Sequence, residues 1–152
     1  MKEIIVKYVR TSCNTNLTAK VPEYATEGSA GMDLSAFIEE DLVIRPGEIV
    51  KIPTGIAVQM PDSSIAGFIF PRSGLSSKYG VSLANCVGVI DSDYTGEIIC
   101  PMINHGRDNY TIKKGERIAQ IVFMPVLRAV MKEVKELEET ERGSGGFGST
   151  GS

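Results

Sequence analysis

Two aspartates and a tyrosine lie between two apolar runs in the segment Val87–Glu97, which reads VGVIDSDYTGE. A carboxylate at the mouth of a pocket can take a proton from water, and an aromatic ring nearby can shape that pocket. If the chain is extended here, Asp91 and Asp93 share one face; if it turns, Asp91 and Tyr94 approach each other. Asp93 has a structural alternative, because aspartates often hydrogen-bond to the backbone of their own turn. The flanking apolar runs favour a β-hairpin, and the residues alone leave the choice of carboxylate open.

A second candidate group is PRSG at Pro71–Gly74, directly after the apolar segment FIF. The guanidinium group of Arg72 is a rigid fork of donors that matches phosphate oxygens. Ser73 adds a hydroxyl group, and Gly74 has no side chain that would keep a ligand away from the backbone amides. An ordinary β-turn with a solvated arginine explains the same residues equally well.

The C-terminal segment RGSGGFGSTGS, residues 142–152, contains five glycines together with Arg142 and Phe147. Its composition is that of a flexible linker. The alternative is a mobile lid, in which the backbone holds an anion, Arg142 pairs with phosphate and Phe147 stacks on a planar base. No Lys-Ser/Thr pair follows the glycines, so the segment is not a P-loop.

Short segments rich in valine and isoleucine must position these groups. Around residues 41–61 the pattern predicts strands at Leu42–Ile44, Ile49–Ile52 and Ile56–Met60, with turns at Pro46-Gly47 and at Pro53-Thr54-Gly55. Similar segments recur along the chain, and many short strands with frequent turn signals predict an all-β sandwich or barrel.

The segment Val130–Arg142 departs from this pattern. Val130, Val134 and Leu137 have the spacing of a helical face, whereas an edge strand with a charged face is also compatible with the sequence. Periodicity in one sequence leaves both assignments open.

Composition excludes several classes of protein. The 152 residues are 42% apolar and 23% charged with a net charge of -3, typical of one globular domain without a basic surface for duplex nucleic acid. No apolar run reaches ~20 residues and the N-terminus lacks the apolar core of a signal peptide, so no membrane span is expected.

Cys13, Cys86 and Cys100 show no CxxC spacing, which favours reduced thiols in the cytoplasm. His105, the single histidine, lies in a turn-like NHGRD and is not expected to be catalytic.

Five segments resemble, in order and spacing, the five motifs of the trimeric deoxyuridine triphosphatases (dUTPases). They are AGMDLSA (30–36), PRSGL (71–75), NCVGVIDSDYTGE (85–97), GERIAQIVF (115–123) and RGSGGFGSTG (142–151). The second, third and fifth are the most specific. The resemblance implies an all-β, jelly-roll-like β-barrel in residues 1–141, assembled as a homotrimer. It also implies that residues 142–152 form a flexible glycine-rich arm that closes over the active site.

The resemblance implies hydrolysis of dUTP to dUMP and pyrophosphate by in-line attack of water on the α-phosphorus. This reaction limits uracil incorporation into DNA and supplies dUMP for thymidylate synthesis. Mg²⁺ is the implied cofactor, held by the substrate phosphates and waters, with Asp33 supporting those waters or an arginine instead of binding the metal directly. The implied partners are dUTP and further copies of the chain, without nucleic acid or membrane. The implied location is the cytoplasm, or the host cytoplasm or nucleus for a viral protein.

Roles for single residues follow only from the resemblance. Asp91 matches the base that activates water, which leaves Asp93 structural. Asn85 matches the uracil-binding asparagine, and Tyr94 the residue under the deoxyribose, where a 2′-hydroxyl would not fit. Gln120 matches a residue near the α-phosphate, and Phe147 the ring that covers uracil. The other implied binding residues are Arg72, Ser73, Gly74, Val89, Ile90, Arg142, Gly148, Ser149 and Thr150.

Two other functions share features with this one. A dCTP deaminase shares the fold and the trimer but lacks the glycine-rich arm, so residues 142–152 argue against it. A regulatory binding protein built on the same fold would be marked by an insertion, for which 152 residues leave no room. The family resemblance also favours a strand before the arm, against the helical spacing of residues 130–137.

Overall fold

The computed structural model describes residues 3–11 and 17–146. Within these residues the regular secondary structure is almost entirely β-strand, with one short helix, which confirms the predicted fold class. The elements are β1 (Lys7–Arg10), β2 (Glu23–Tyr24), β3 (Met32–Ser35), β4 (Leu42–Ile44), β5 (Ile49–Gln59), β6 (Ile65–Pro71), α1 (Ser73–Tyr79), β7 (Val81–Leu83), β8 (Gly88–Ile90), β9 (Glu97–Asn104), β10 (Tyr110–Ile112) and β11 (Arg117–Pro125). In this part of the chain no helix has the length and apolar character needed to cross a membrane.

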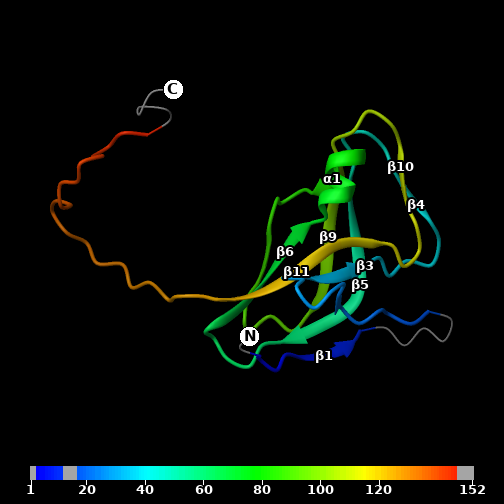
Figure 1. Ribbon diagram of the computed structural model, residues 1–152, viewed down its shortest axis with the longest axis horizontal. Helices are drawn as coiled ribbons and strands as arrows, with labels where there is room; N and C mark the ends of the chain where they lie inside the picture. Colours follow the sequence, from blue (N-terminus) through cyan, green and yellow to red (C-terminus); the bar gives the residue numbers. More distant parts are fainter. Residues whose placement is uncertain (1–2, 12–16, 147–152) are drawn as a thin grey trace.

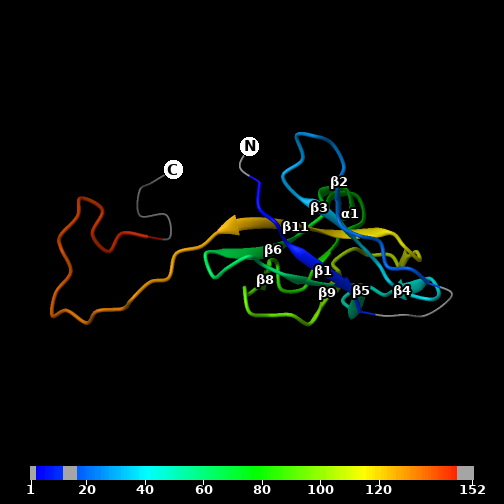
Figure 2. The same ribbon diagram turned by 90° about the horizontal axis from the view of Figure 1, so that it is seen from below.

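Two antiparallel sheets pack face to face around one core (Figure 2). One has the strand order β1-β5-β9-β7 and the other β2-β3-β11-β6-β8, while β10 and β4 form a separate ribbon. Alternate residues of a strand point to opposite faces, so Ile98, Cys100 and Met102 of β9 all face inward and are 0% exposed. Ile69 of β6 and Ile121 of β11 meet them from the other sheet.

The predicted turn at Pro46-Gly47 is confirmed, but the break predicted at Pro53-Thr54-Gly55 is wrong. β5 runs through these residues as one strand, and its register against β9 shifts between Pro53 and Ala57. Gly55 has a φ of 70°, and a Cβ atom there would lie 2.5 Å from Cβ of Ala19. Turn-forming residues therefore mark a bulge inside a strand here, because a bulge has the same need for glycine as a turn.

The hairpin predicted for Val87–Glu97 is also wrong. β8 pairs with β6, whereas β9 pairs with β5 and β7, so the chain passes from one sheet to the other between residues 90 and 97. Two apolar runs around a polar turn look the same in sequence whether the strands pair with each other or with different partners.

PRSG forms the start of a helix instead of a β-turn. Arg72 is the N-cap residue in an extended conformation, and Gly80, with a φ of 70°, is the left-handed C-cap that follows α1. The helix buries only Leu75. A seven-residue helix with one buried side chain has no apolar periodicity, so the sequence did not indicate it.

After β11 the chain leaves the barrel in both views (Figures 1 and 2). Residues 126–146 form neither helix nor strand, so both assignments of Val130–Arg142 are wrong for the single chain. Large apolar side chains in this segment have almost no contacts: Leu127 is 100% exposed, Met131 92% and Leu137 87%. In the single chain these apolar side chains are therefore left exposed to solvent.

Candidate active site

Three of the five motifs meet on the outer face of the five-stranded sheet. Gln120 of β11 lies in register with Asp33 of β3 on one side and with Phe70 of β6 on the other. Residues that are in register across neighbouring strands point to the same face. Side chains from the first, second and fourth motifs therefore converge, although they are distant in sequence.

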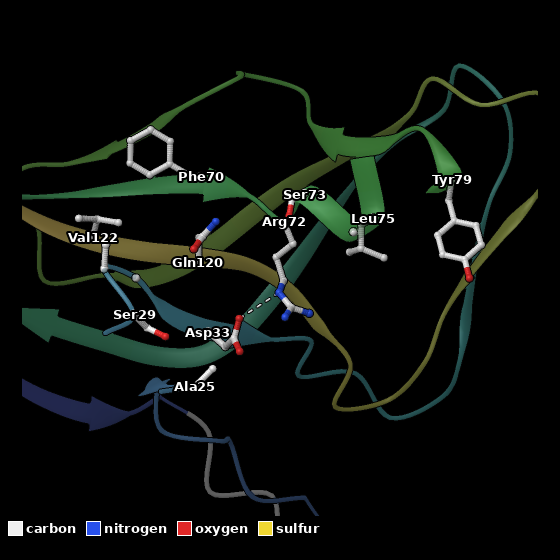
Figure 3. A pocket seen from close by; sticks show the side chains of 13 residues that line it. Ala25, Ser29, Asp33, Phe70, Arg72, Ser73, Leu75, Tyr79, Gln120 and Val122 are labelled. Carbon is white, nitrogen blue, oxygen red and sulfur yellow. Dashed lines mark ion pairs between the residues drawn. The ribbon is translucent and has the colours of Figure 1, made fainter. Parts of the chain in front are cut away.

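Asp33 is the centre of this group and forms two ion pairs. Its Oδ1 lies 3.0 Å from Nε of Arg72 (Figure 3). Its Oδ2 lies 2.9 Å from Nη1 of Arg117. The Asp33 side chain is 17% exposed, that of Arg72 29% and that of Arg117 54%. The Asp33–Arg72 pair is the more shielded from water, so the carboxylate holds the Arg72 guanidinium at a defined place above the sheet.

The ion pair borders a cleft of about 560 Å³ between the sheet and α1. Helix geometry leaves the backbone amides of Ser73 and Gly74, in the first turn of α1, without an intrahelical acceptor. Gly74 has open space around the position of a Cβ, and the Gln120 side chain is held by a hydrogen bond from Nε2 to the Pro71 carbonyl (3.0 Å). The cleft thus combines one guanidinium, a hydroxyl and backbone donors, which suits phosphate oxygens.

A second cavity of about 300 Å³ lies between the segment that follows β7, including β8, and the middle of β9. Asn85, Val89 and Ile90 line it, together with apolar groups that include Ile69 and Ile99. Asn85 lies in the turn between β7 and β8, where the Cys86 amide donates to the Leu83 carbonyl (3.1 Å) and the Val87 amide to the Asn85 carbonyl (2.7 Å). An apolar slot with one carboxamide can take a planar ring that has polar edges.

The two cavities share no lining residue. Phe70 lines the larger one and Ile69 the smaller one, and successive residues of a strand point to opposite faces. The structure therefore brings Arg72, Ser73, Gly74 and Gln120 together, and separately Asn85, Val89 and Ile90.

The two aspartates lie where the chain passes between the sheets. The Tyr94 amide donates to the Asp91 carbonyl (3.1 Å), so the turned alternative is correct and the extended one is not. The Tyr94 hydroxyl donates to the Glu97 carbonyl (2.9 Å), and its ring covers Gly96, where a Cβ would lie 2.6 Å from the hydroxyl oxygen. Asp91 and Asp93 are both exposed, and neither lines the two cavities.

Arg142 lies in the irregular segment that follows β11, and its Nε donates to the Gly145 carbonyl (2.8 Å). Phe147, Gly148, Ser149 and Thr150 lie outside the described residues. Among residues 3–11 and 17–146, no group of three His, Cys, Asp or Glu side chains is arranged to hold a metal ion.

Sequence reasoning missed Arg117 and Tyr79. Arg117 opens β11 beside the predicted Gln120, and a basic residue so close to a phosphate-binding candidate was an available signal. Tyr79, the last residue of α1, lines the larger cleft. The neighbouring residues of Tyr79 do not indicate this position, because the helix that follows PRSG places the side chain at the cleft.

Two pKa values near the cavities are shifted. Burial raises the pKa of the Cys100 thiol from 9.0 to about 12, which makes it a neutral lining group of the smaller cavity. Burial also raises the pKa of the Tyr110 phenol, and its hydrogen bond to the Glu116 carboxylate raises it further. Tyr110 therefore stays a hydrogen-bond donor at neutral pH.

Known proteins match nearly the whole chain. The family model described as dUTPase matches residues 18–151. The deoxyuridine 5'-triphosphate nucleotidohydrolase of Desulfitobacterium hafniense is 51% identical over 98% of this chain and 96% of its own, and that of Haemophilus influenzae is 47% identical over 99% of both. The solved structure of Staphylococcus bacteriophage 80alpha dUTPase with dUPNHPP has a TM-score of 0.85 at 30% identity, and the match covers 97% of this chain and 99% of the phage protein. Matches of this length and identity show that the chain belongs to the dUTPase family.

Proposed function

We propose that this chain hydrolyses dUTP to dUMP and pyrophosphate, which limits uracil incorporation into DNA and supplies dUMP for thymidylate synthesis. The observation that carries the proposal is the Arg72 guanidinium, held by Asp33 beside the first turn of α1 in a chain of this family. Phosphoryl transfer needs positioning and charge neutralisation more than covalent chemistry, and this cleft is suited to both.

In this proposal the larger cleft binds the triphosphate. Arg72 contacts phosphate oxygens with the guanidinium edge that Asp33 leaves open, and the amides of Ser73 and Gly74 donate to the same chain of oxygens. Gln120, restrained by the Pro71 carbonyl, lies near the α-phosphate. The carboxylate of Asp33 is already engaged by two guanidinium groups, so its role is to orient Arg72.

The smaller cavity binds the nucleoside. Asn85 and the backbone of Val89 and Ile90 read the edge of uracil, and the Tyr94 ring, fixed against Gly96, packs under the deoxyribose. Asp91 takes the proton from the attacking water. The new bond from the water oxygen to the α-phosphorus forms as the bond to the bridging oxygen breaks, and pyrophosphate leaves on the opposite side. Asp93 supports the turn.

One nucleotide must touch both cavities, and these lie on opposite faces of β6. We therefore propose that a site combines the phosphate cleft of one copy with the nucleoside cavity of another, in a homotrimer. The exposed apolar side chains of residues 127–137 are consistent with a segment that packs on a neighbouring copy. Residues 142–152 would then reach a site as an arm, with Arg142, Ser149 and Thr150 at the phosphates, Phe147 over uracil, and Gly148 giving the backbone close access.

The substrate in this proposal is the magnesium complex of dUTP. Mg²⁺ favours six oxygen ligands and retains several waters, so the phosphates supply most of what it needs. When bound, Mg²⁺ would supply positive charge that offsets the phosphate oxygens, while Arg72, Gln120 and the amides of Ser73 and Gly74 bind and orient the complex.

Pyrophosphate release from dUTP, dCTP, dTTP and UTP, each with magnesium, tests the proposal. We expect strong preference for dUTP. The bases of dCTP and dTTP would leave polar or crowded groups at the uracil site, and the ribose 2′-hydroxyl of UTP would have no room. Equal rates on dUTP and UTP would contradict the role of Tyr94 in sugar selection. Turnover of dCTP to dUTP with ammonia would identify a deaminase instead.

A further inference from the structure

We propose that the Tyr79 ring is the end wall of the phosphate cleft and limits the number of phosphates that the site accepts, with Tyr110 and Glu116 as positioning residues behind it. This inference rests on the proposed function, because it assigns a phosphate-chain limit to the same cleft. Tyr79 is in none of the five motifs.

The cleft has two chemically different ends (Figure 3). Phe70 and Val122 line one end, Tyr79 lies at the other, and Arg72 and Ser73 lie between them. The Phe70 and Val122 side chains cannot donate to phosphate oxygens, whereas the guanidinium and the backbone donors beside them suit those oxygens. A nucleotide therefore lies with its phosphate chain directed toward Tyr79.

Tyr79 is backed by a second aromatic ring. The centroid of the Tyr110 ring lies 5.0 Å from that of Tyr79 at an interplanar angle of 48°, within the range of favourable aromatic pairs. Nζ of Lys78 lies over the Tyr79 ring, 5.1 Å from its centroid. These contacts restrict the ring although Tyr79 itself is 43% exposed.

Tyr110 is in turn anchored to the segment that carries the fourth motif. Its hydroxyl donates to Oε1 of Glu116, and Oε2 of the same carboxylate accepts from the Lys113 amide (2.8 Å). The Glu116 carbonyl accepts from the Ala36 amide (2.8 Å), which ties this carboxylate to the end of the first motif. The wall is thus connected to the same strands that hold Asp33 and Gln120.

The backbone at Tyr79 is equally restricted. A Cβ on Gly106 would lie 2.5 Å from the Tyr79 carbonyl oxygen, and the His105 amide donates to the Gly80 carbonyl (2.8 Å). Asn104, which is 0% exposed, holds this turn by accepting from the Gly106 amide (2.8 Å). The Tyr79 ring packs on Tyr110 and its backbone is fixed by the 104–106 turn. Moving the ring aside for a longer ligand would therefore cost free energy.

The test compares dUTP with deoxyuridine 5'-tetraphosphate, both with magnesium, as the ratio of their kcat/KM values. We expect the wild-type protein to disfavour the tetraphosphate and Tyr79→Ala to raise its relative kcat/KM on the order of tenfold, the scale of size discrimination by a pocket wall. Tyr79→Phe should keep the wild-type ratio because the ring is retained. Tyr110→Ala should shift the ratio in the same direction by a smaller factor, and Tyr110→Phe less again.

Thr111→Ala, an exposed neighbour of Tyr110 on β10, is the matched control and should leave the ratio and the thermal midpoint unchanged. An unchanged ratio in a folded Tyr79→Ala protein that hydrolyses dUTP would overturn the inference and leave the proposed function intact. If the wild-type protein does not hydrolyse dUTP, the proposed function fails. Calorimetric binding of inorganic tri- and tetrapolyphosphate to wild type and Tyr79→Ala then decides the inference, which equal preference in both proteins would overturn.

Discussion

Replacing Asp33 with alanine removes the carboxylate that holds Arg72 over the phosphate cleft. A hydrogen bond between charged groups contributes ~1.5–3 kcal/mol when it is shielded, and the Asp33–Arg72 pair is mostly buried. The pair with Arg117 is more exposed to water and contributes at most ~1 kcal/mol. The loss that matters for activity is therefore the orientation of Arg72.

We expect Asp33→Ala to lower kcat/KM for dUTP by roughly 10- to 100-fold, since each tenfold corresponds to ~1.4 kcal/mol of transition-state stabilisation. Asp33→Asn keeps one acceptor oxygen and should lie between this variant and the wild type. Arg117→Gln removes only the exposed partner and should change kcat/KM less than about threefold.

Steady-state kinetics and urea unfolding of the three variants, measured side by side, distinguish orientation from loss of fold. The fold should persist, because the predicted loss is smaller than the ~5–15 kcal/mol stability of a typical domain. Normal kinetics in a folded Asp33→Ala protein would refute the reasoning, because Arg72 would then be positioned without its carboxylate. An equal loss of kcat/KM in Arg117→Gln would show that the exposed Asp33–Arg117 pair contributes as much as the Asp33–Arg72 pair.

Three further outcomes are expected. Asp91→Asn should lower turnover ~10²–10⁴-fold with nucleotide affinity largely kept, because the proton acceptor is lost; a larger loss of turnover in Asp93→Asn would mean that the wrong carboxylate was chosen. Deletion of residues 142–152 should leave the thermal midpoint almost unchanged but remove most turnover, whereas near-normal turnover would identify a simple tail. The contribution of Cys100 to the unfolding free energy should be fully present below about pH 9 and be lost as the pH rises toward about 12, because the thiol loses its proton at lower pH in the unfolded state. Cys100→Ala should flatten that fall, and an unchanged alkaline slope would contradict the assignment.

Local chemistry in the sequence was sufficient for several elements of this fold. β4 lies at the predicted Leu42–Ile44, and the turn at Pro46-Gly47 follows from the restricted φ of proline and the freedom of glycine. These features depend on neighbours in the chain, so they can be read without knowledge of the fold.

The motifs also identify the family from the sequence alone, because five residue patterns in one order are far more specific than any secondary-structure signal. The local structure that single residues adopt was harder to predict. Gly55 looks like a turn and is a bulge, and PRSG looks like a turn and starts a helix. Glycine and proline report a local backbone requirement, and several structures share that requirement.

Only the tertiary structure decided which residues meet. Asp33 could have paired with any basic residue, and it reaches Arg72 and Arg117 because β3, β11 and β6 are neighbours in one sheet. Tyr79 became a wall of the cleft because α1 carries it there. The two cavities lie on opposite faces of β6 because β8 joins one sheet and β9 the other. Sequence thus determined the family, the strand-forming segments and the chemical groups, whereas strand pairing, a long-range choice among similar apolar partners, determined the site.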